Sequence, residues 1–333
     1  MGASLKDVAL LACVSMKTVS NVVNDYPFVT PETRAKVQQA IEALDYRPNL
    51  SARLLRGGRT GLVALAVPEI GMPYYAELAE AVVQQAKTHG WTVLIDQTFG
   101  DRDTERLVAE GIKSHLVDGL IVSPLTLTAR DIERRRATTP LVLLGERLSN
   151  ASVDHVAIDN VAGARAATEH LVAIGRTRIA AIGAQPGQPG PAALRLKGYR
   201  EALRRAGIPY DKALVAPATN YHRVDGASAM RDLLDNAAPD AVFCFNDTLA
   251  LGAIRTLLSS GRRVPEDVAV IGFDDIDEGG FSTPSLSTIA PDKAQIAELA
   301  LALLGRRIAD EGAEPQEATA DFALVVREST AGL

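Results

Sequence analysis

The chain has 333 residues, of which 47% are hydrophobic and 23% are charged, so it is globular in composition and long enough for more than one core. Every apolar run is broken before the roughly 18 residues of a membrane span, and no membrane partner is expected. The two cysteines, Cys13 and Cys244, form no CxxC or Cys/His cluster, which argues against a disulfide framework and a metal site and fits a reducing cytoplasm.

Residues 9–13, ALLAC, look like the cleavage box of an exported lipoprotein. The apolar run before the cysteine is shorter than the roughly 7 to 15 residues of a signal core, and Lys6 and Asp7 adjoin it. Cytoplasmic location is therefore the preferred interpretation, and export is the alternative.

Two short helices joined by a tight turn are predicted first. Ser4 and Asp7 fit a capping box ahead of an apolar stripe that begins at Leu5. Ser15 is a good N-cap for a second helix over residues 16–24. Its apolar side holds Val19, Val22 and Val23, and of these Val19 and Val23 are expected to hold it on its neighbours.

A third helix should start at Thr30-Pro31, with Val37, Ala40, Ile41 and Leu44 as its apolar stripe. Such an arrangement fits a helix-turn-helix that lays its second helix in the major groove. Lys17 and Asn21 are then placed to read base edges, and Ser20 and Asn24 to bond phosphates. The alternative is a three-helix bundle with a merely solvated face.

Charge is distributed unevenly. Residues 1–60 hold eight Lys or Arg and five Asp or Glu, a net charge of +3, which leaves −9 on the rest of the chain. Between Tyr46 and Pro68 there is no acidic residue, whereas Arg47, Arg53, Arg56 and Arg59 recur. This pattern suits a segment that meets phosphates, although a solvated basic linker would share it.

Within that segment a short helix over 50–56 is predicted, capped by Asn49 and stopped by Gly57-Gly58. A helix of this length is marginal alone and should fold on a partner. Leu55 suits a minor-groove wedge that unstacks a base step, with Arg53 and Arg56 near phosphates.

From Gly61 onward the pattern changes to buried-strand runs alternating with amphipathic helices. The clearest strand runs are GLVALAVP, WTVLIDQT, DGLIVSPL, PLVLLGER, RIAAIGA, AVFCFND and VAVIGFDD. The predicted fold class is α/β, doubly wound, with two similar lobes across a cleft. Ligands bind at the carboxyl ends of such strands. Polar groups follow those ends at Ser123, Glu146, Asp159, Asn246, Asp247, Asp274 and Asp275.

The chain resembles the lactose-repressor/galactose-repressor (LacI/GalR) family of bacterial transcription regulators over nearly its whole length. The resemblance is carried by LKDVALLACVSMKTVSNVVN, VTPETRAKV, YRPNLSARLLR, IDNVAGARAATEHLVAIGRTRIAAIG, RLKGYREAL, FNDTLALGAI and VIGFDDI, in that order. The later segments alone would also fit periplasmic sugar-binding proteins, so a solute-binding protein that feeds a transporter is the rival interpretation.

The resemblance implies roles for matching positions. Met16, Lys17 and Asn21 lie where relatives read operator bases, and Leu55 matches the minor-groove wedge. The full expected DNA-contact set is Ser15, Met16, Lys17, Thr18, Ser20, Asn21, Asn24, Arg53, Leu55 and Arg56. The expected effector-contact set is Tyr74, Tyr75, Ser123, Arg195, Tyr221, Asn246 and Asp274, which suits a carbohydrate or nucleoside-like ligand.

Several of these residues also have a structural interpretation. Tyr74 and Tyr75 can begin a core helix, and Asn246 and Asp274 can cap the elements that follow them. Asp159 and Asn160 are assigned structural roles. Cys13 stands where relatives place glycine, which costs about 1 kcal/mol if the turn needs a positive φ. Lys17 and Asn21 differ from common readers, so the operator sequence stays open.

The expected organisation is a helix-turn-helix domain over 1–48, a hinge over 49–60 and an effector-binding core over 61–333. The core divides into an N-lobe of about 61–159 plus 291–320 and a C-lobe of about 160–290 plus 321–333. The expected function is a homodimeric repressor of a pseudo-palindromic operator in double-stranded DNA, controlled by a small molecule, most simply a sugar. No catalytic motif and no cofactor or metal site is found, so an enzyme is not expected.

Overall fold

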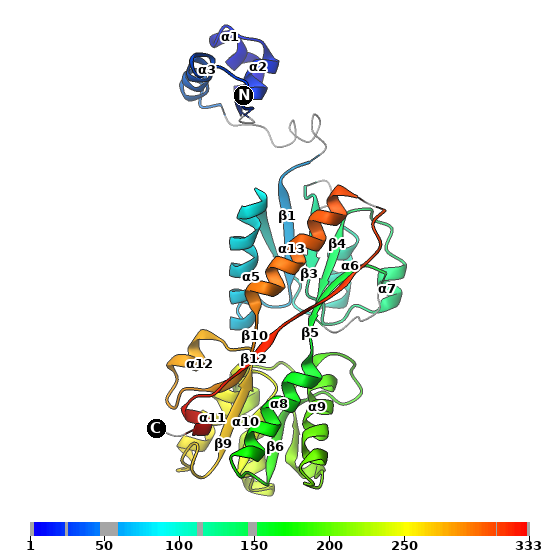
Figure 1. Ribbon diagram of the computed structural model, residues 1–333, viewed down its shortest axis with the longest axis vertical. Coiled ribbons are helices and arrows are strands. Elements are labelled where there is room, and N and C mark those ends of the chain that lie inside the picture. The colour runs from blue at the N-terminus through cyan, green and yellow to red at the C-terminus, as the bar shows by residue number, and fades with distance from the viewer. Residues whose placement is uncertain are drawn as a thin grey trace. The chain divides into compact units, whose positions relative to one another are not determined.

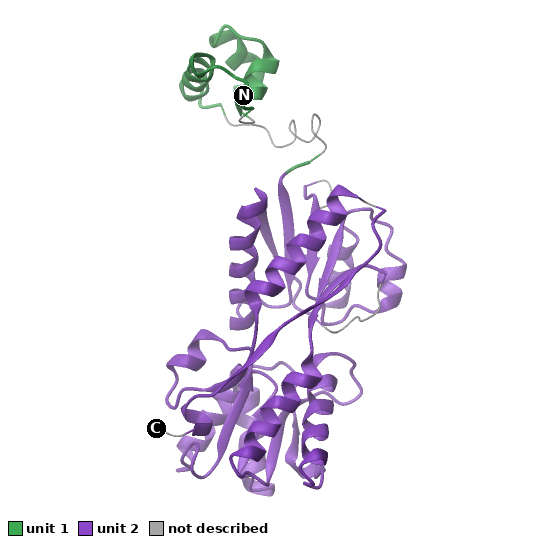
Figure 2. Ribbon diagram, in the orientation of Figure 1, with its two compact units in different colours: residues 1–60 green, residues 61–333 purple. Residues whose placement is uncertain are grey.

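A computed structural model describes residues 3–23, 26–46, 59–111, 116–145, 152–310 and 312–331. These residues form two compact units, one within residues 1–60 and one within residues 61–333 (Figure 2). We call the first unit the head and the second the core. None of the helices in the described ranges is long and apolar enough to cross a membrane.

The described part of the head consists of α1 (Leu5–Leu11), α2 (Met16–Val23) and α3 (Pro31–Ala43) (Figure 1). One apolar cluster lies between them, made of Val8, Ala9, Ala12, Val19, Val22, Val37, Ala40 and Tyr46. Val23, expected to be a main packing residue of α2, is only partly buried, and Val22 is buried instead. Positions 19, 22 and 23 lie on the same side of a helix. The neighbouring helices cover this side mainly at Val19 and Val22, so Val23 lies at its margin.

Polar side chains begin all three helices as predicted. The Asp7 N–H donates to Ser4 Oγ at 3.4 Å, and the Ser4 N–H donates to Asp7 Oδ2 at 2.8 Å. The predicted capping box is therefore confirmed. The Thr18 N–H donates to Ser15 Oγ at 3.1 Å. Thr30 caps α3 ahead of Pro31. These caps satisfy backbone donors that helix starts leave open.

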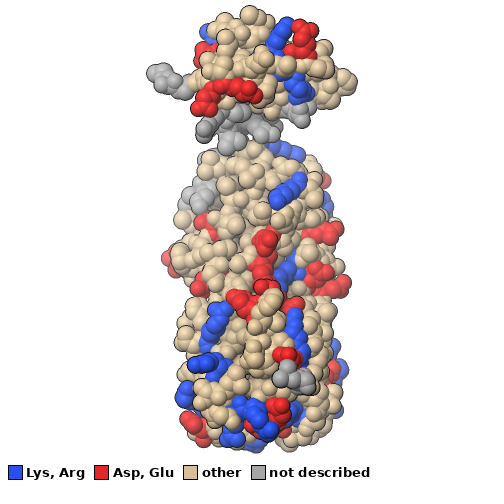
Figure 3. Space-filling model, turned by 90° about the vertical axis from the view of Figure 1, so that its left-hand side faces the viewer, with Lys and Arg blue, Asp and Glu red and all other residues tan. Residues whose placement is uncertain are grey.

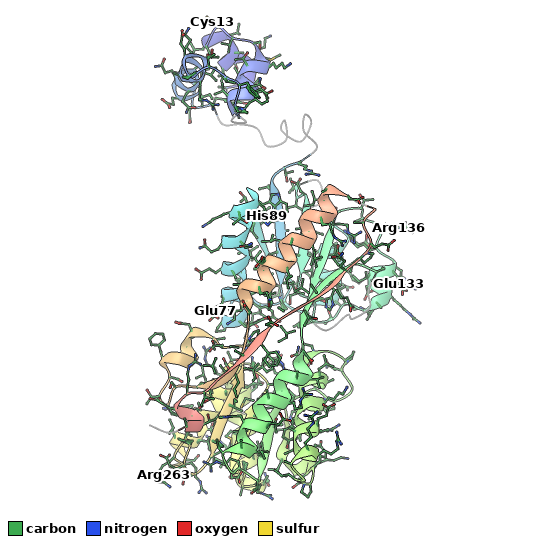
Figure 4. All side chains as sticks on the ribbon, in the orientation of Figure 1. Cys13, Glu77, His89, Glu133, Arg136 and Arg263 are labelled. Atoms are coloured by element: carbon green, nitrogen blue, oxygen red, sulfur yellow. The ribbon has the colours of Figure 1, made fainter. Side chains whose placement is uncertain are left out.

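The turn between α1 and α2 contains Cys13 at φ +52°. This left-handed conformation suits glycine, because a β-carbon there is strained. The Cys13 side chain is exposed at the surface of the head (Figure 4). Burial of the thiol therefore does not offset the strain.

Cys13→Gly is expected to stabilise the head by about 1 kcal/mol, because glycine adopts this φ without strain. Cys13→Ala keeps a β-carbon and is the matched control, for which no gain is expected. Hydrogen exchange of the amides in 5–43 measures the opening free energy of the head apart from that of the core. Equal protection in the two variants would show that the turn stores no such strain.

In the core, the first lobe holds a six-stranded sheet in the order β11-β5-β4-β3-β1-β2, with every pair parallel. Its strands are β1 (Leu62–Val67), β2 (Thr92–Gln97), β3 (Gly119–Val122), β4 (Leu141–Leu144), β5 (Asp154–Ile158) and β11 (Glu317–Ala320). Its helical elements are α5 (Pro73–Ala86), η1 (Lys87–His89), α6 (Arg102–Ala109), α7 (Ala129–Glu133) and α13 (Lys293–Ala309). β2 was expected to be buried, but it is an edge strand with Leu94 and Ile95 exposed.

The second lobe holds a sheet in the order β12-β10-β9-β8-β6-β7, parallel except for β12. Its strands are β6 (Ile179–Ala184), β7 (Val215–Pro217), β8 (Ala241–Cys244), β9 (Ala269–Phe273), β10 (Ser287–Pro291) and β12 (Phe322–Val325). Its helical elements are α8 (Asn160–Ala173), α9 (Pro191–Arg205), η2 (Lys212–Leu214), α10 (Arg223–Asn236), α11 (Asp247–Ser259), α12 (Asp277–Phe281) and α14 (Glu328–Ala331). The predicted two-lobed, doubly wound α/β class is confirmed.

The chain crosses from one lobe to the other at three places, and Figure 1 shows them where the two lobes meet. β5 leads into α8, β10 leads into α13, and β11 leads into β12. Asp159 caps α8 and Asp292 caps α13 directly after two of these crossings. The Asp292 N–H also donates to the Asp321 carbonyl at 2.9 Å, which ties the second crossing to the third.

Candidate functional site

The exposed face of α2 carries most of the residues expected to meet DNA. Lys17, Ser20 and Asn21 have the i, i+3, i+4 spacing of one helical face, opposite Val19 and Val22. Met16 and Lys17 are exposed, and Ser20 and Asn21 are partly exposed. Ser15 and Thr18 bond each other through their hydroxyls at 2.9 Å at the helix start. Asn24, Arg53, Leu55 and Arg56 lie outside the described residues.

All seven residues of the expected effector set line one cavity of about 750 Å³ between the two lobes of the core. Tyr74 and Tyr75 come from the start of α5 and Ser123 from the end of β3 in the first lobe. Arg195, Tyr221, Asn246 and Asp274 come from the second lobe. The two lobes thus supply different faces of the same cavity.

Arg195 is the anchor of the second-lobe face. Its Nε donates to Asn160 Oδ1 at 2.6 Å, and one terminal nitrogen donates to the Phe245 carbonyl. The guanidinium lies 3.7 Å from the centre of the Phe273 ring, and its other nitrogen is 3.8 Å from Asp274 Oδ1. Asn160, assigned a structural role from the sequence, therefore holds Arg195 in place.

Asn246 has a structural role at the cavity wall. Its Oδ1 accepts the Leu249 N–H at 2.9 Å as the cap of α11, and its Nδ2 donates to the Tyr221 carbonyl at 3.2 Å. Tyr74 and Tyr75 likewise both begin α5 and line the cavity. Asp274 does not cap α12, because that position belongs to Ile276.

Two tyrosines of the cavity, Tyr75 and Tyr221, are neutral hydrogen-bonding groups. Burial raises the pKa of Tyr75 well above its usual range, the charge of Asp274 adds to this, and its hydroxyl bonds the Ser123 side chain. Burial also raises the pKa of Tyr221, whose hydroxyl donates to the Gly183 carbonyl. Neutral phenols beside Arg195 and Asp274 suit a ligand that carries hydroxyl groups.

Two of these residues have left-handed backbone. Tyr221 has φ +61° and Asp274 has φ +116°, and Asp275 follows at +49°. Such conformations in non-glycine residues persist only where surrounding contacts enforce them, and they concentrate at binding sites. The strain at Tyr221 and Asp274 lies on the second-lobe wall of the cavity, where it directs these side chains.

Other lining residues were missed by the sequence analysis, namely Glu69, Gln97, Phe99, Thr126, Gln185 and His222. Each lies in a loop or at the end of a strand or helix, where periodicity gives no signal. Glu69 and His222 also join the lobes, because Glu69 Oε2 lies 3.0 Å from His222 Nε2. Within the described ranges no cluster of three or more His, Cys, Asp or Glu could hold a metal ion.

A second contact between the lobes is made by Glu77, which Figure 4 labels near the junction of the lobes. Its Oε1 accepts the Asp277 N–H at 2.9 Å, at the first residue of α12. Its Oε2 lies 2.8 Å from Lys293 Nζ, which also donates to the Asp275 carbonyl at 2.8 Å. Glu77 is one helical turn beyond Tyr74 in α5. The same helix therefore lines the cavity and forms a hydrogen bond to the second lobe.

Arg195→Ala is expected to lower the unfolding free energy of the core by about 1–3 kcal/mol for each buried acceptor that loses its donor. Lys197→Ala, an exposed position on α9, is the control and should change stability by less than about 0.5 kcal/mol. Urea denaturation of the full chain measures both variants. Equal stability of the two variants would contradict the anchoring role.

Glu77→Ala is expected to release the Asp277 amide and to speed its hydrogen exchange at least about tenfold, because the bond across the lobes is lost. Glu80→Ala, one turn further along α5 and exposed, is the control. Hydrogen exchange of the Asp277 amide, measured by NMR in the absence of ligand, tests this bond. Unchanged protection of that amide in Glu77→Ala would show that the Glu77 carboxylate does not stabilise the contact between the lobes.

A helical head with an exposed polar face on α2, together with a two-lobed core that has a ligand-sized cavity between its lobes, defines a DNA-binding regulator with a ligand-binding core. The comparisons with known proteins agree with this class. Residues 4–49 match the family described as bacterial regulatory proteins, lacI family, and residues 168–330 match the periplasmic binding protein-like domain.

The relatives extend over nearly the whole chain. The ribose operon repressor of Escherichia coli (strain K12) is 36% identical over 92% of this chain and 93% of its own length. The HTH-type transcriptional regulator CelR of Thermobifida fusca is 38% identical over 98% of each chain. The chain therefore belongs to the lacI family of bacterial transcriptional regulators.

Solved structures lead to the same assignment. The lac repressor dimer bound to operator and the anti-inducer ONPF has a TM-score of 0.84 at 27% identity, covering 99% of both chains. The transcriptional regulator CelR–cellobiose complex has a TM-score of 0.73 at 34% identity, covering 98% of this chain and 99% of the other. A solute-binding protein would not account for the match at residues 4–49, and the matched relatives named above are regulators rather than enzymes.

Proposed function

We propose that the protein is a cytoplasmic repressor that binds a pseudo-palindromic operator as a homodimer and is controlled by a carbohydrate bound in the core cavity. The observation that carries the proposal is the meeting of all seven expected effector residues, from both lobes, in one cavity. Hydroxyl-rich ligands suit its neutral tyrosines and its Arg195, Asn246 and Asp274 groups.

The DNA half of the proposal rests on α2. Its exposed polar stripe, held on Val19 and Val22, has the size and chemistry of a recognition helix. One such helix reads a half-site, so two copies are needed for a symmetric operator. In the face of the core that Figure 3 draws, acidic and basic side chains are interspersed, which is typical of a solvated surface.

The choice of a carbohydrate is supported by relatives with known ligands or named operons. The CelR structure contains cellobiose, a lacI-family structure from Enterococcus faecium contains ribose at 26% identity, and the E. coli relative is named a ribose operon repressor. In a two-lobed core such a ligand acts by binding one arrangement of the lobes better than another.

Lys17→Ala is expected to weaken binding to the operator by about 1–3 kcal/mol and to relax the preference at one position per half-site, because a base contact is lost. The operator is obtained by selection from a pool of randomised duplexes, and a random duplex is the control. An equal loss on both duplexes would show that Lys17 contacts phosphate and does not read bases.

Asp274→Asn is expected to leave operator affinity without ligand within about threefold of wild type while it weakens carbohydrate binding by roughly 2 kcal/mol, because a charged acceptor is removed. Asp235→Asn, an exposed position on α10, is the control. Operator titrations with and without the carbohydrate measure both effects. A wild-type response in the Asp274 variant would remove that residue from the site.

A further inference from the structure

The cavity of the core has a buried part and an exposed part. Arg195, Asn246 and Asp274 are each less than a tenth exposed and carry charged or amide groups. Phe99 lines the same cavity but is 77% exposed. A volume of about 750 Å³ is large for a single sugar ring and falls in the upper part of the range of ligand pockets.

Several apolar side chains line the exposed part of the cavity, and they come from both lobes. Phe99 and Leu125 belong to loops that follow β2 and β3 of the first lobe. Pro186 and Pro189 come from the GAQPGQPG segment after β6, which is absent from the set of expected ligand contacts. All four side chains are exposed. Exposed apolar side chains within a cavity mark a surface that a ligand covers.

The loops in this part of the cavity are held by polar contacts. Glu105 on α6 is completely buried, and its carboxylate accepts the N–H groups of Leu125 at 2.7 Å and of Thr126 and Leu127 at 2.9 Å. On the other lobe, Gln185 donates from Nε2 to the Thr219 carbonyl at 3.1 Å. Phe99 itself has φ +57°, a conformation that a bulky residue adopts only under constraint. The exposed part of the cavity is therefore preformed.

The charges on the described lining residues favour a neutral ligand. Arg195 already donates to Asn160 and Phe245 and lies beside Asp274, so its charge is balanced. Glu69 adds a second carboxylate to the wall and is paired with His222. An anionic group, such as a sugar phosphate, would meet two carboxylates and a guanidinium whose charge is already paired with Asp274.

We infer that the effector is a neutral glycoside of at least two rings, whose inner ring bonds Arg195, Asn246 and Asp274 and whose outer ring stacks on Phe99. The inference rests on the proposed function and names the substrate class of the same cavity. The apolar face of a pyranose covers an aromatic ring well, and Pro186 and Pro189 enclose the outer ring from the other lobe. Phe99 is thus the residue that selects for the second ring.

The test uses full-length protein and calorimetric titration. The probes are glucose, galactose, mannose and xylose, the disaccharides cellobiose, maltose, lactose, mannobiose and xylobiose, and glucose 6-phosphate. The variants are Phe99→Ala and the conservative Phe99→Tyr, and Phe28→Ala in the head removes an equally exposed phenyl ring as the control. Because Phe99 is exposed, its truncation should not affect folding, and urea denaturation checks this.

We expect one disaccharide to bind at least about tenfold more tightly than its constituent monosaccharides. Phe99→Ala should reduce this ratio to about twofold and leave monosaccharide binding unchanged, whereas Phe99→Tyr and Phe28→Ala should keep it. A monosaccharide that binds as tightly as the best disaccharide, or tighter binding of the phosphate, would overturn the inference. So would an equal effect of Phe99→Ala on both ligand sizes, or no binding by any probe.

Operator titration with each probe that binds separates this inference from the proposed function. A disaccharide that binds through Phe99 without changing operator affinity would support the second ring site and count against carbohydrate control of DNA binding. If only a monosaccharide binds tightly and it changes operator affinity, carbohydrate control of DNA binding is supported and the second ring site is contradicted.

Discussion

The placement of Arg195 is the constraint on which the second-lobe face of the cavity depends. A guanidinium that is buried requires partners for its N–H groups, and it finds them at the start of α8 through Asn160 and at the end of β8 through Phe245. It also covers the Phe273 ring at the end of β9. One side chain on α9 thereby fixes the relative positions of three strand or helix ends, which are the places where a doubly wound sheet binds ligands.

The same region stores strain that a buried acid helps to maintain. Asp247 is fully buried, and burial raises its pKa well above the usual range, with the charge of Asp274 adding to the effect. Its oxygens accept from the Ile276 N–H at 3.0 Å and from the Thr288 hydroxyl at 2.7 Å. The first bond holds the residue that follows the left-handed pair at 274 and 275, and the second holds Thr288 on the neighbouring strand β10. Asp247 is not among the described lining residues of the cavity, so its carboxyl supports the wall from behind.

The sequence predicted the fold class because its main signals are local. The capping pairs at Ser4 and Thr30 and the seven apolar runs all correspond to elements of the structure. Among the strands that were not picked out as runs, β7, β11 and β12 are short or partly exposed, whereas β5 and β10 are buried but contain polar residues such as Asp154 and Ser287. The positions of β11 and β12 are set by pairing with distant strands. Pairing of this kind leaves no periodic signal in a single segment.

The residues that line the candidate cavity were predicted only in part, because some of them lie in loops. Polar residues at strand ends, such as Ser123 and Asn246, are visible as breaks in apolar runs, and the family resemblance supplied Arg195. Glu69, Phe99 and His222 lie in loops, where the chain direction depends on tertiary contacts such as the bonds that Glu105 makes. Asn160 was recognised as structural, but its partner Arg195 lies 35 positions away and could be identified only in three dimensions.

Control of DNA binding by the cavity requires that the ligand distinguish two arrangements of the lobes, since a ligand with equal affinity for both shifts nothing. Helix α5 contacts both the cavity and the junction of the lobes. α5 begins with Tyr74 and Tyr75 in the cavity wall, and Glu77 one turn later holds α12 and Lys293. The chain enters this lobe at Gly61, whose N–H donates to Asp118 Oδ2 at 2.7 Å. The chain that follows the head enters this lobe, so a ligand that fixes α5 against the second lobe acts on the lobe that is covalently connected to the head.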